Sequence, residues 1–494
     1  MKISWKTSVF ASIPLALTLA LGLSCSNDSK DDDASTSGDE VAASNPLATA
    51  YPGALALSVF PDESASAGLM LQAEGDAAKQ IARPPKEKLD DAKKRLKGEA
   101  DCFDKTMAGE HQGGGAPTTC YDFDSDMNPV SNNGREYGTT DGTDGSGQAC
   151  MVTFAKQQVD EIVFKVDRAL GMVQGLLCAA KKKAAADGSE LSLPEVGSDG
   201  LNLKSAMEDE LGKVGDFGMN SALMTAYKND DGSVGYKTIV SFSTPNGAED
   251  EITLRHNPSN GDSKDESGVL TFKRSGGMQG APLVGDKVQV MSINYERKTD
   301  DDGEEKSIAE LRTANISTDY EPLNSKGLVA FENLPREASN SDIEAIKFVA
   351  FDINPETGVG DLSYWKNPGG RYTESARGFL FNIKEEDGAL AGCGISGATR
   401  DVSVMAALED TTGDKILAPV RYWHPRPGGW SASPDADPRY SSTEGNKITE
   451  QCFKQNTETG KYVKTSTHER GYDVKEGSDV EPPRRPDLPP PIQN

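Results

Sequence analysis

The sequence predicts an α+β protein: a disulfide-stapled helical N-terminal segment followed by an antiparallel β meander. Three observations support this. Apolar residues recur every seven positions between Cys150 and Ala186, alternation with a period of two begins near Phe217, and turn-forming residues separate the alternating runs. Because no helical pattern interrupts these runs, parallel crossover units are excluded, and we expect a curved sheet, a sandwich or a barrel.

The chain begins with the features of an export signal. Lys2 and Lys6 precede an apolar run from Val9 to Leu23, which is shorter than the roughly 20 residues needed to span a bilayer. Leu21-Gly22-Leu23-Ser24-Cys25 resembles the lipobox of bacterial lipoproteins, with Gly22 where leucine is usual. The resemblance implies that residues 1–24 are a signal peptide and that Cys25 is lipidated. Cleavage by an ordinary signal peptidase, which releases a secreted protein, is the alternative.

The layout as a whole resembles that of uncharacterised bacterial envelope lipoproteins, and the resemblance rests on the short, non-specific N-terminal motif. The resemblance implies a location in the cell envelope, with attachment to a membrane through the N-terminal lipid. Ser26 is not acidic, which implies the outer membrane, at its periplasmic or its surface face.

Composition divides the rest of the chain into four parts. Residues 25–50 are an acidic flexible spacer, and residues 474–494 are a proline-rich tail with polyproline character. Between them we expect a helical, disulfide-containing domain at 51–190 and an antiparallel β-rich domain at 215–470. The formal net charge of −26 excludes nucleic acid as a partner, because such a chain repels polyanions.

Two helices are expected in the first domain. Residues 86–103 read as a surface helix with one apolar stripe, and residues 150–186 as a long helix. Two sevenfold rows on the long helix indicate packing against another helix, within the chain or between chains. These rows are Val152, Val159, Val166 and Val173, and Ala155, Ile162, Ala169 and Leu176.

Six cysteines remain after Cys25, and in an exported protein an even number indicates disulfides. Cys150 and Cys178 would lie about 42 Å apart on one helix, too far to pair with each other. If the first four cysteines pair among themselves, two connectivities remain: 102–150 with 120–178, or 102–178 with 120–150. Cys393 then pairs with Cys452. Zinc is disfavoured because the chain has no Cys-x-x-Cys pair.

Alternating runs predict the strands of the second domain, with turn signals such as Asp387-Gly388 between them. Polar residues alternate with apolar ones, so we expect one face of the sheet to be wet. The expected strands are 236–244, 250–256, 269–274, 287–297, 306–316, 328–334, 345–353, 362–365, 378–384, 402–407 and 416–423.

Catalytic signatures are absent from the sequence, and we expect no enzyme. Gly392 to Gly397 has the appearance of a nucleophile loop, but Cys393 is better assigned to a disulfide. Asp122, Asp124 and Asp126 alternate in the way that surrounds a hard cation, so calcium is one hypothesis for this loop. A solvated acidic loop is the plainer interpretation. No other cofactor is expected.

The remaining candidate is aromatic. The three tryptophans outside the signal peptide lie in two similar stretches, 364–372 and 422–430, each with a Pro-Gly-Gly turn and a nearby arginine. Rigid aromatic rings beside arginine are favoured at recognition surfaces, and packing of hairpin ends onto the sheet edge is the alternative. The candidate ligand-binding residues are Tyr364, Trp365, Arg371, Tyr372, Tyr422, Trp423, Arg426 and Trp430.

These observations favour a lipid-anchored envelope protein with a non-catalytic binding or structural role and an envelope glycan or lipid as ligand. One alternative is a carrier that encloses a lipid or other apolar ligand in a curved sheet. A second alternative is a hydrolase of envelope polymer, which would need paired carboxylates in a cleft.

Overall fold

The chain divides into two units, Met1–Ser37 and Gly38–Asn494, and every residue described here belongs to the second. The computed structural model describes residues 50–55, 92, 94–96, 100–103, 143, 146–189, 191–213, 217–244, 247, 249–259, 265–275, 287–299, 303–320, 343–354, 357–366, 376–399, 424–426, 429–431 and 448–470.

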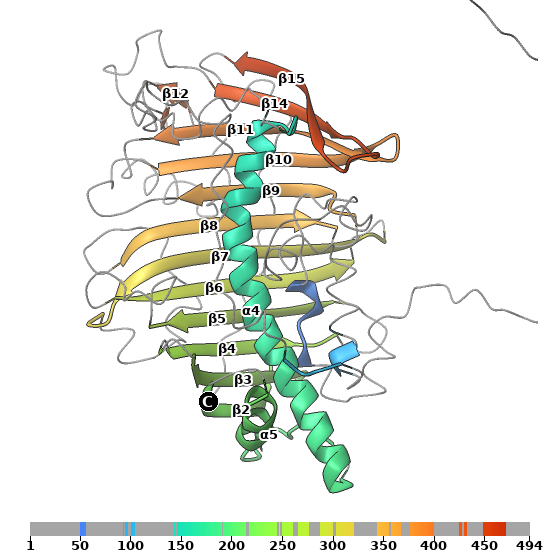
Figure 1. Ribbon diagram of the computed structural model, residues 1–494, viewed down its shortest axis with the longest axis vertical. Helices are drawn as coiled ribbons and strands as arrows, with labels where there is room; N and C mark the ends of the chain where they lie inside the picture. The colour runs from blue at the N-terminus through green and yellow to red at the C-terminus, as the bar shows by residue number, and fades with distance from the viewer. Residues whose placement is uncertain are drawn as a thin grey trace, which may run out of the picture. The chain divides into compact units, whose positions relative to one another are not determined.

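Thirteen strands form one antiparallel sheet in which neighbours follow one another in chain order, except that β11 pairs with β14 (Figure 1). The sheet is open, with β1 and β15 at its edges, so the predicted meander is confirmed as a single layer. The strands are β1 Leu201–Asn202, β2 Gly218–Lys228, β3 Val234–Ser243, β4 Glu249–Asn257, β5 Glu266–Arg274, β6 Lys287–Thr299, β7 Glu305–Ser317, β8 Ile343–Ile353, β9 Gly360–Lys366, β10 Ala376–Glu386, β11 Ala389–Thr399, β14 Ile448–Gln455 and β15 Tyr462–Arg470. A separate hairpin pairs β12 His424–Arg426 with β13 Gly429–Ser431.

Eight of the eleven predicted strands coincide with observed ones, and the other three (328–334, 402–407 and 416–423) lie outside the described residues. The turn at Asp387-Gly388 is confirmed: both residues have positive φ, as a two-residue hairpin requires. Strands β1, β2, β11, β14 and β15 of the sheet and both strands of the β12–β13 hairpin were not predicted. In β11, glycines at 392, 394 and 397 weaken the alternation that marks a strand.

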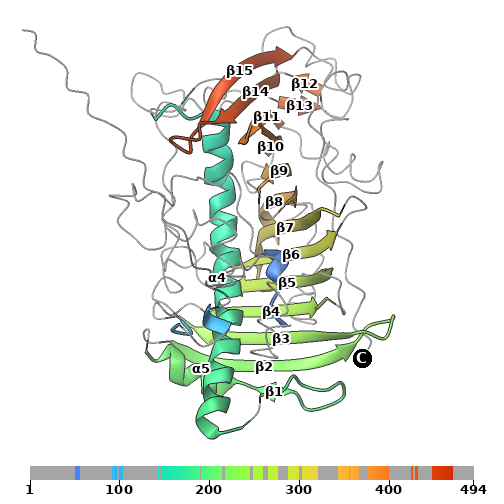
Figure 2. The same cartoon turned by 90° about the vertical axis from the view of Figure 1, so that its right-hand side faces the viewer.

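The long helix α4, Cys150–Asp187, crosses the strands on one face of the sheet (Figures 1 and 2). Its 38 residues give a length of about 57 Å, and 13 strands give a sheet about 58 Å wide. At its first end, Ala149 N–H donates to the Tyr462 carbonyl at 2.8 Å and Met151 N–H donates to Gln451 Oε1 at 3.1 Å. Its last end lies beside α5, Lys204–Leu211. One helix therefore spans nearly the whole sheet.

The sevenfold rows of α4 face the sheet, which corrects the prediction that they pack against another helix. Each residue turns an α-helix by about 100°, so both rows lie on the side of α4 opposite Gly175 and Cys178. Gly175 and Cys178 contact residues 102–103. Met151, on the side of the rows, lies against Gly394 of β11. Seven helical residues advance about 10.5 Å and two strands about 9.6 Å, so a sevenfold row meets every second strand. The row members Val152, Ala155, Val159, Val166, Ala169, Val173 and Leu176 are at most 5 % exposed.

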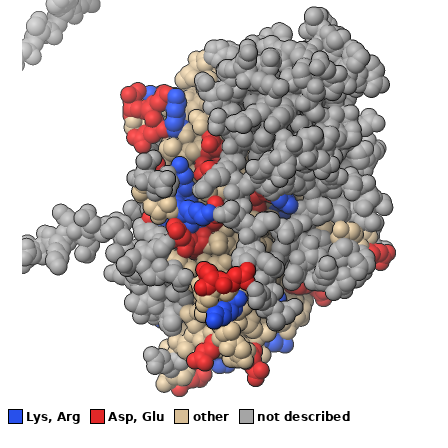
Figure 3. Space-filling view, turned by 180° about the vertical axis from the view of Figure 1, so that it is seen from behind, with Lys and Arg blue, Asp and Glu red and all other residues tan. Residues whose placement is uncertain are grey.

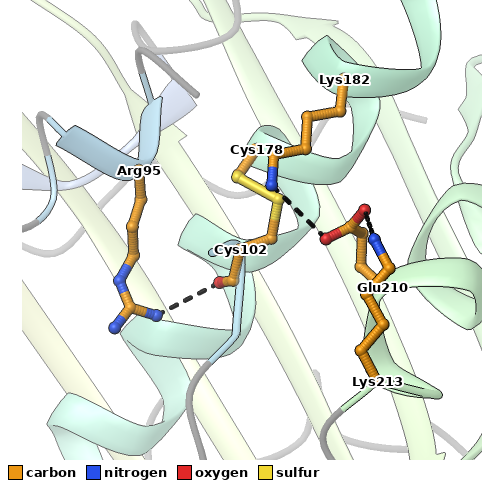
Figure 4. Close-up of polar contacts among 6 residues, drawn as sticks. All are labelled: Arg95, Cys102, Cys178, Lys182, Glu210 and Lys213. Atoms are coloured by element: carbon orange, nitrogen blue, oxygen red, sulfur yellow. Dashed lines mark hydrogen bonds and ion pairs between the residues drawn. A yellow bond between two sulfur atoms is a disulfide. The ribbon is translucent and has the colours of Figure 1, made fainter. Parts of the chain in front are cut away.

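The outer side of α4 is covered by the segment that contains Cys102 (Figure 4). The Cys102–Cys178 disulfide joins this segment to the helix, and Arg95 donates to the Cys102 carbonyl at 3.2 Å. Gly175 leaves room for the Phe103 ring, because a Cβ at position 175 would lie 2.0 Å from Phe103 Cε1. Nearby, Glu210 of α5 pairs with Lys182 of α4 at 3.6 Å and with Lys213.

The Cys102–Cys178 pairing excludes one of the two predicted connectivities. Cys150 is also disulfide-bonded, and Cys120, its partner in the remaining connectivity, lies outside the described residues. Cys393–Cys452, predicted by elimination, is confirmed.

Helix and sheet share one hydrophobic cluster, so the segments predicted as separate domains are joined through a common core. The cluster runs along the α4 side of the sheet and includes Leu254, Ile293, Leu311, Phe351 and Phe381. None of the described helices is long and apolar enough to cross a membrane.

The face of the sheet away from α4 carries both polar and apolar side chains, and its central part is buried, which corrects the prediction that this face is wet. Thr253, Ser292, Asn294, Glu310 and Arg312 alternate with the core residues and are all at most 5 % exposed. Glu310 and Arg312 satisfy each other by an ion pair, which lowers the penalty of burying two charges. Acidic and basic side chains lie side by side on the described surface seen from this side (Figure 3).

Candidate functional site

The two ends of the strands differ in the connections they carry. Because consecutive strands are antiparallel, alternate connections lie at the same end of the sheet. We call one the short-connection end; its connections are 229–233, 258–265, 300–304, 354–359, 387–388 and 456–461. We call the other the long-connection end; its connections are 244–248, 275–286, 318–342, 367–375 and 400–447. Most of the residues in these connections therefore lie at the long-connection end.

Both aromatic stretches belong to the long-connection end. The first leaves β9 at Lys366 and returns at Ala376 of β10, and the second lies within the connection between β11 and β14. In β9, Trp365 is in register with Phe348 and Gly378. Arg371, Tyr372, Tyr422 and Trp423 lie outside the described residues.

Tyr364 was predicted to contact a ligand, but its side chain is buried in the protein interior. It is 2 % exposed and stacks on Phe379 with ring centroids 4.9 Å apart. In β9 the even-numbered residues Leu362 and Tyr364 face α4, so the Tyr364 ring packs in the hydrophobic core. Its burial favours the packing interpretation for this residue.

The hairpin β12–β13 carries two of the predicted residues on its backbone. Trp430 is paired with Pro425, and Arg426 with Gly429. Strand β13 lies against β11 at the long-connection end. Of the second aromatic stretch, the hairpin residues that the structure describes therefore lie close to the sheet.

The Gly392–Gly397 stretch is part of strand β11 and not a nucleophile loop. Cys393 is directly opposite Cys452 and disulfide-bonded to it. The bond joins the two strands between which the 400–447 connection is inserted, so it closes the base of that connection. Gly394 is needed for packing, since a Cβ there would lie 2.4 Å from the Phe381 ring.

The calcium hypothesis falls on residues that the structure does not describe. Asp122, Asp124 and Asp126 lie in the undescribed range 104–142. Among the described residues, no group of three or more His, Cys, Asp or Glu side chains is arranged to hold a metal ion.

A buried polar cluster lies at the short-connection end, on the α4 face. His256 of β4 is 1 % exposed, its Nδ1 lies 2.8 Å from Tyr295 Oη, and its Nε2 lies 3.6 Å from Glu266 Oε2. Arg297, directly opposite Glu266, forms an ion pair with Glu305 of β7. Gly268, between His256 and Tyr295 in the same row, leaves room for the tyrosine hydroxyl.

The cluster holds a short segment from the N-terminal part of the described chain. The backbone N–H groups of Gly53 and Ala54 donate to Glu266, and the single turn η2, Gly53–Leu55, lies on β6 and β7. Burial raises the pKa of Glu266 to about 7, against the opposing effects of Arg297 and the two N–H donors. Burial also raises the pKa of Tyr51, with the charges of Asp167 and Glu266 acting in the same direction.

A second buried polar cluster lies at the long-connection end of the same strands. Arg168 of α4 contacts Asp250 of β4 at 3.0 Å, and Arg274 of β5 lies 3.5 Å from the other oxygen. Asp250 is fully buried, and this burial raises its pKa even though both guanidinium groups lower it. This cluster fixes the middle of the helix to the sheet.

The sequence contains a signal for both clusters that the strand prediction did not use. Asp250, Ile252, Leu254 and His256 have the same parity, so one strand places a carboxylate and an imidazole on its apolar face. Buried ionisable groups need partners, so their presence on the core side predicts polar clusters there. The partners Arg168, Glu266 and Tyr295 are not identifiable from that pattern.

Comparison with known proteins returned no match, whether to protein families, to curated sequences or to solved structures.

Proposed function

We propose that this protein is a lipid-anchored cell-envelope protein that binds an envelope ligand, without catalysis, through the long-connection end of its sheet. The observation that carries the proposal is the unequal distribution of connections between the two ends. Binding residues are commonly placed on loops that a rigid sheet holds at one end. Here the rigid part is a sheet of 13 strands fixed to a helix of 38 residues.

The chemistry of the two aromatic stretches supports a carbohydrate or lipid headgroup as the ligand. Trp365, Trp423 and Trp430 are the only tryptophans after the signal peptide, and all belong to connections or strand ends at the long-connection end. Flat aromatic faces next to Arg371 and Arg426 suit sugar rings and anionic groups.

The packing of the apolar face favours this role over a carrier of apolar cargo. Leu254, Ile293 and Leu311 are at most 2 % exposed and belong to the cluster shared with α4. The apolar side chains on this face of the sheet therefore have the helix as their partner, and an apolar ligand bound there would have to displace it.

Tryptophan fluorescence tests the proposal directly. The mature, unlipidated chain would be titrated with cell-wall glycan fragments and, separately, with phospholipid vesicles, each with calcium and with a chelator. We expect a saturable change with one ligand class, because every tryptophan lies in the proposed binding region. A calcium-dependent response would support the Asp122, Asp124 and Asp126 hypothesis. No response to either ligand class would contradict the binding role.

Matched variants separate the two ends of the sheet. Trp365→Phe, Trp423→Phe and Trp430→Phe combined should abolish the heat of binding in calorimetry. Val234→Ser, at a 39 % exposed apolar residue of the short-connection end, should leave it unchanged. Lipidation is tested independently with Cys25→Ser, which should move the protein from the detergent phase to the aqueous phase in detergent partitioning.

A further inference from the structure

Residues 50–55 contact the sheet through apolar packing and through one largely buried carboxylate, that of Glu266. Ala50, Ala54 and Leu55 are at most 2 % exposed, and the polar contacts of this segment converge on Glu266, which accepts from the N–H groups of Gly53 and Ala54. The Glu266 side chain is 10 % exposed. A Cβ at Gly53 would lie 3.4 Å from Glu266 Oε1, so backbone and carboxylate are in direct contact.

Charged and titratable groups surround Glu266 on every element packed against it. Strand β4 contributes His256, β6 contributes Tyr295 and Arg297, and β7 contributes Glu305. Residues 50–55 contribute Tyr51 to these groups. Near Tyr51 lie Asp167 of α4 and Arg95 of the segment that contains Cys102. Two carboxylates share the Arg297 guanidinium: Glu305 forms an ion pair with it, and Glu266 also feels its charge.

We propose that Glu266 is a proton-dependent latch that holds residues 50–55 on the sheet. Opening of the latch releases the segment next to the predicted spacer while the rest of the sheet stays folded. Ionisation of Glu266 in the closed state places a second negative charge near Glu305 in a buried site, whereas opening returns that charge to water.

The direction of the pH effect follows from the pKa of Glu266 in the closed and open states of the latch. In the closed state this pKa is about 7, and in the open state it returns to the ordinary value of 4.5. The closed state therefore binds the proton more tightly, and it is favoured at low pH. Opening increases as pH rises from 4.5 to 7 and then levels off, which corresponds to a change in the opening constant on the order of 50-fold between pH 5 and pH 8.

Hydrogen exchange of the full mature chain tests the proposal. Protection factors, corrected for the intrinsic pH dependence of exchange, would be measured between pH 5 and pH 8 for peptides that cover residues 50–55 and for peptides of β6 and β7. We expect the protection of 50–55 to fall by the stated factor while β6 and β7 keep theirs. Equal protection of 50–55 at both pH values in the unmodified chain would overturn the proposal without any variant.

Two variants identify the responsible group. Glu266→Gln keeps an acceptor of the same shape but cannot ionise, so the protection of 50–55 should lose its pH dependence. Glu251→Gln on β4, whose carboxylate is 30 % exposed and paired with Lys273, should behave like the unmodified chain. If Glu266→Gln kept the full pH dependence, a different group would be the switch and the latch would be rejected.

Discussion

Two buried polar clusters lie on the same face of the same strands, and they differ in the groups that face their carboxylates. At the long-connection end, Asp250 contacts two guanidinium groups, those of Arg168 and Arg274. At the short-connection end, Glu266 faces the His256 imidazole and Arg297, and its pKa is about 7. The comparison shows that one sheet fixes its helix through a carboxylate between two arginines and its N-terminal segment through a carboxylate that titrates near neutral pH.

The largest expected effect is at the Asp250 cluster. Asp250→Asn removes the carboxylate that the buried guanidinium groups of Arg168 and Arg274 contact, and the free energy of unfolding should fall by about 3–5 kcal/mol. Denaturant unfolding at neutral pH measures this loss. Glu251→Gln, next to it on the partly exposed face, should change stability by less than about 0.5 kcal/mol. Equally small losses in the two variants would show that the Asp250 contacts do not fix the helix to the sheet.

Removal of the Cys393–Cys452 disulfide sharpens the same comparison, because this bond fixes the long-connection end covalently. Cys393→Ser with Cys452→Ser should reduce the free energy of unfolding by about 2–4 kcal/mol, since the reduced chain regains the freedom of the enclosed loop. The measurement is denaturant unfolding without reductant. Unchanged stability would show that β11–β14 pairing alone fixes the base of the 400–447 connection.

At the Glu266 cluster the effect depends on pH. The pKa of Glu266 is raised on folding, so its protonated form favours the folded state, and its contribution to stability is present below pH 4.5 and lost as pH rises through 7. The stability difference between the unmodified chain and Glu266→Gln should therefore change by about 1–3 kcal/mol across this range. Thermal unfolding at half-unit pH steps measures it. A difference that stays constant with pH would mean that Glu266 does not titrate in the folded protein.

The smallest effect concerns the support of His256. Tyr295→Phe removes the hydroxyl 2.8 Å from Nδ1 and should lower stability by about 1–2 kcal/mol. Tyr227→Phe, which loses a bond to Asn257 at a less buried site, is the matched control and should have a smaller effect. Equal losses in the two variants would indicate that the Tyr295 hydroxyl has no special role in the cluster.

The sequence predicted most of the fold because local patterns determine it. Alternation located the strands from β3 to β10, and the sevenfold rows located α4 to within one residue at its last end. Its assumed partner was wrong, because a row that repeats every seven residues fits a helical neighbour and a sheet of crossing strands almost equally well. Strand β11 was missed because its glycines, required by contacts with Phe381 and Met151, resemble a loop.

The candidate sites were less predictable because they depend on long-range contacts. Glu266 meets Ala54 across more than two hundred residues, and Met151 meets Gln451 across three hundred. No local pattern encodes such pairs. The order of the strands, once known, assigns both aromatic stretches to one end, although the stretches themselves were identified only by composition.

The match between seven helical residues and two strands also bears on how such a chain can change length over evolutionary time. One additional hairpin widens the sheet by about 9.6 Å and leaves every later connection at its original end. Two more turns of helix, about seven residues, restore the coverage. A duplication of one hairpin and one heptad would therefore lengthen the protein without exchanging its two ends, whereas gain or loss of a single strand would move every later connection to the opposite side.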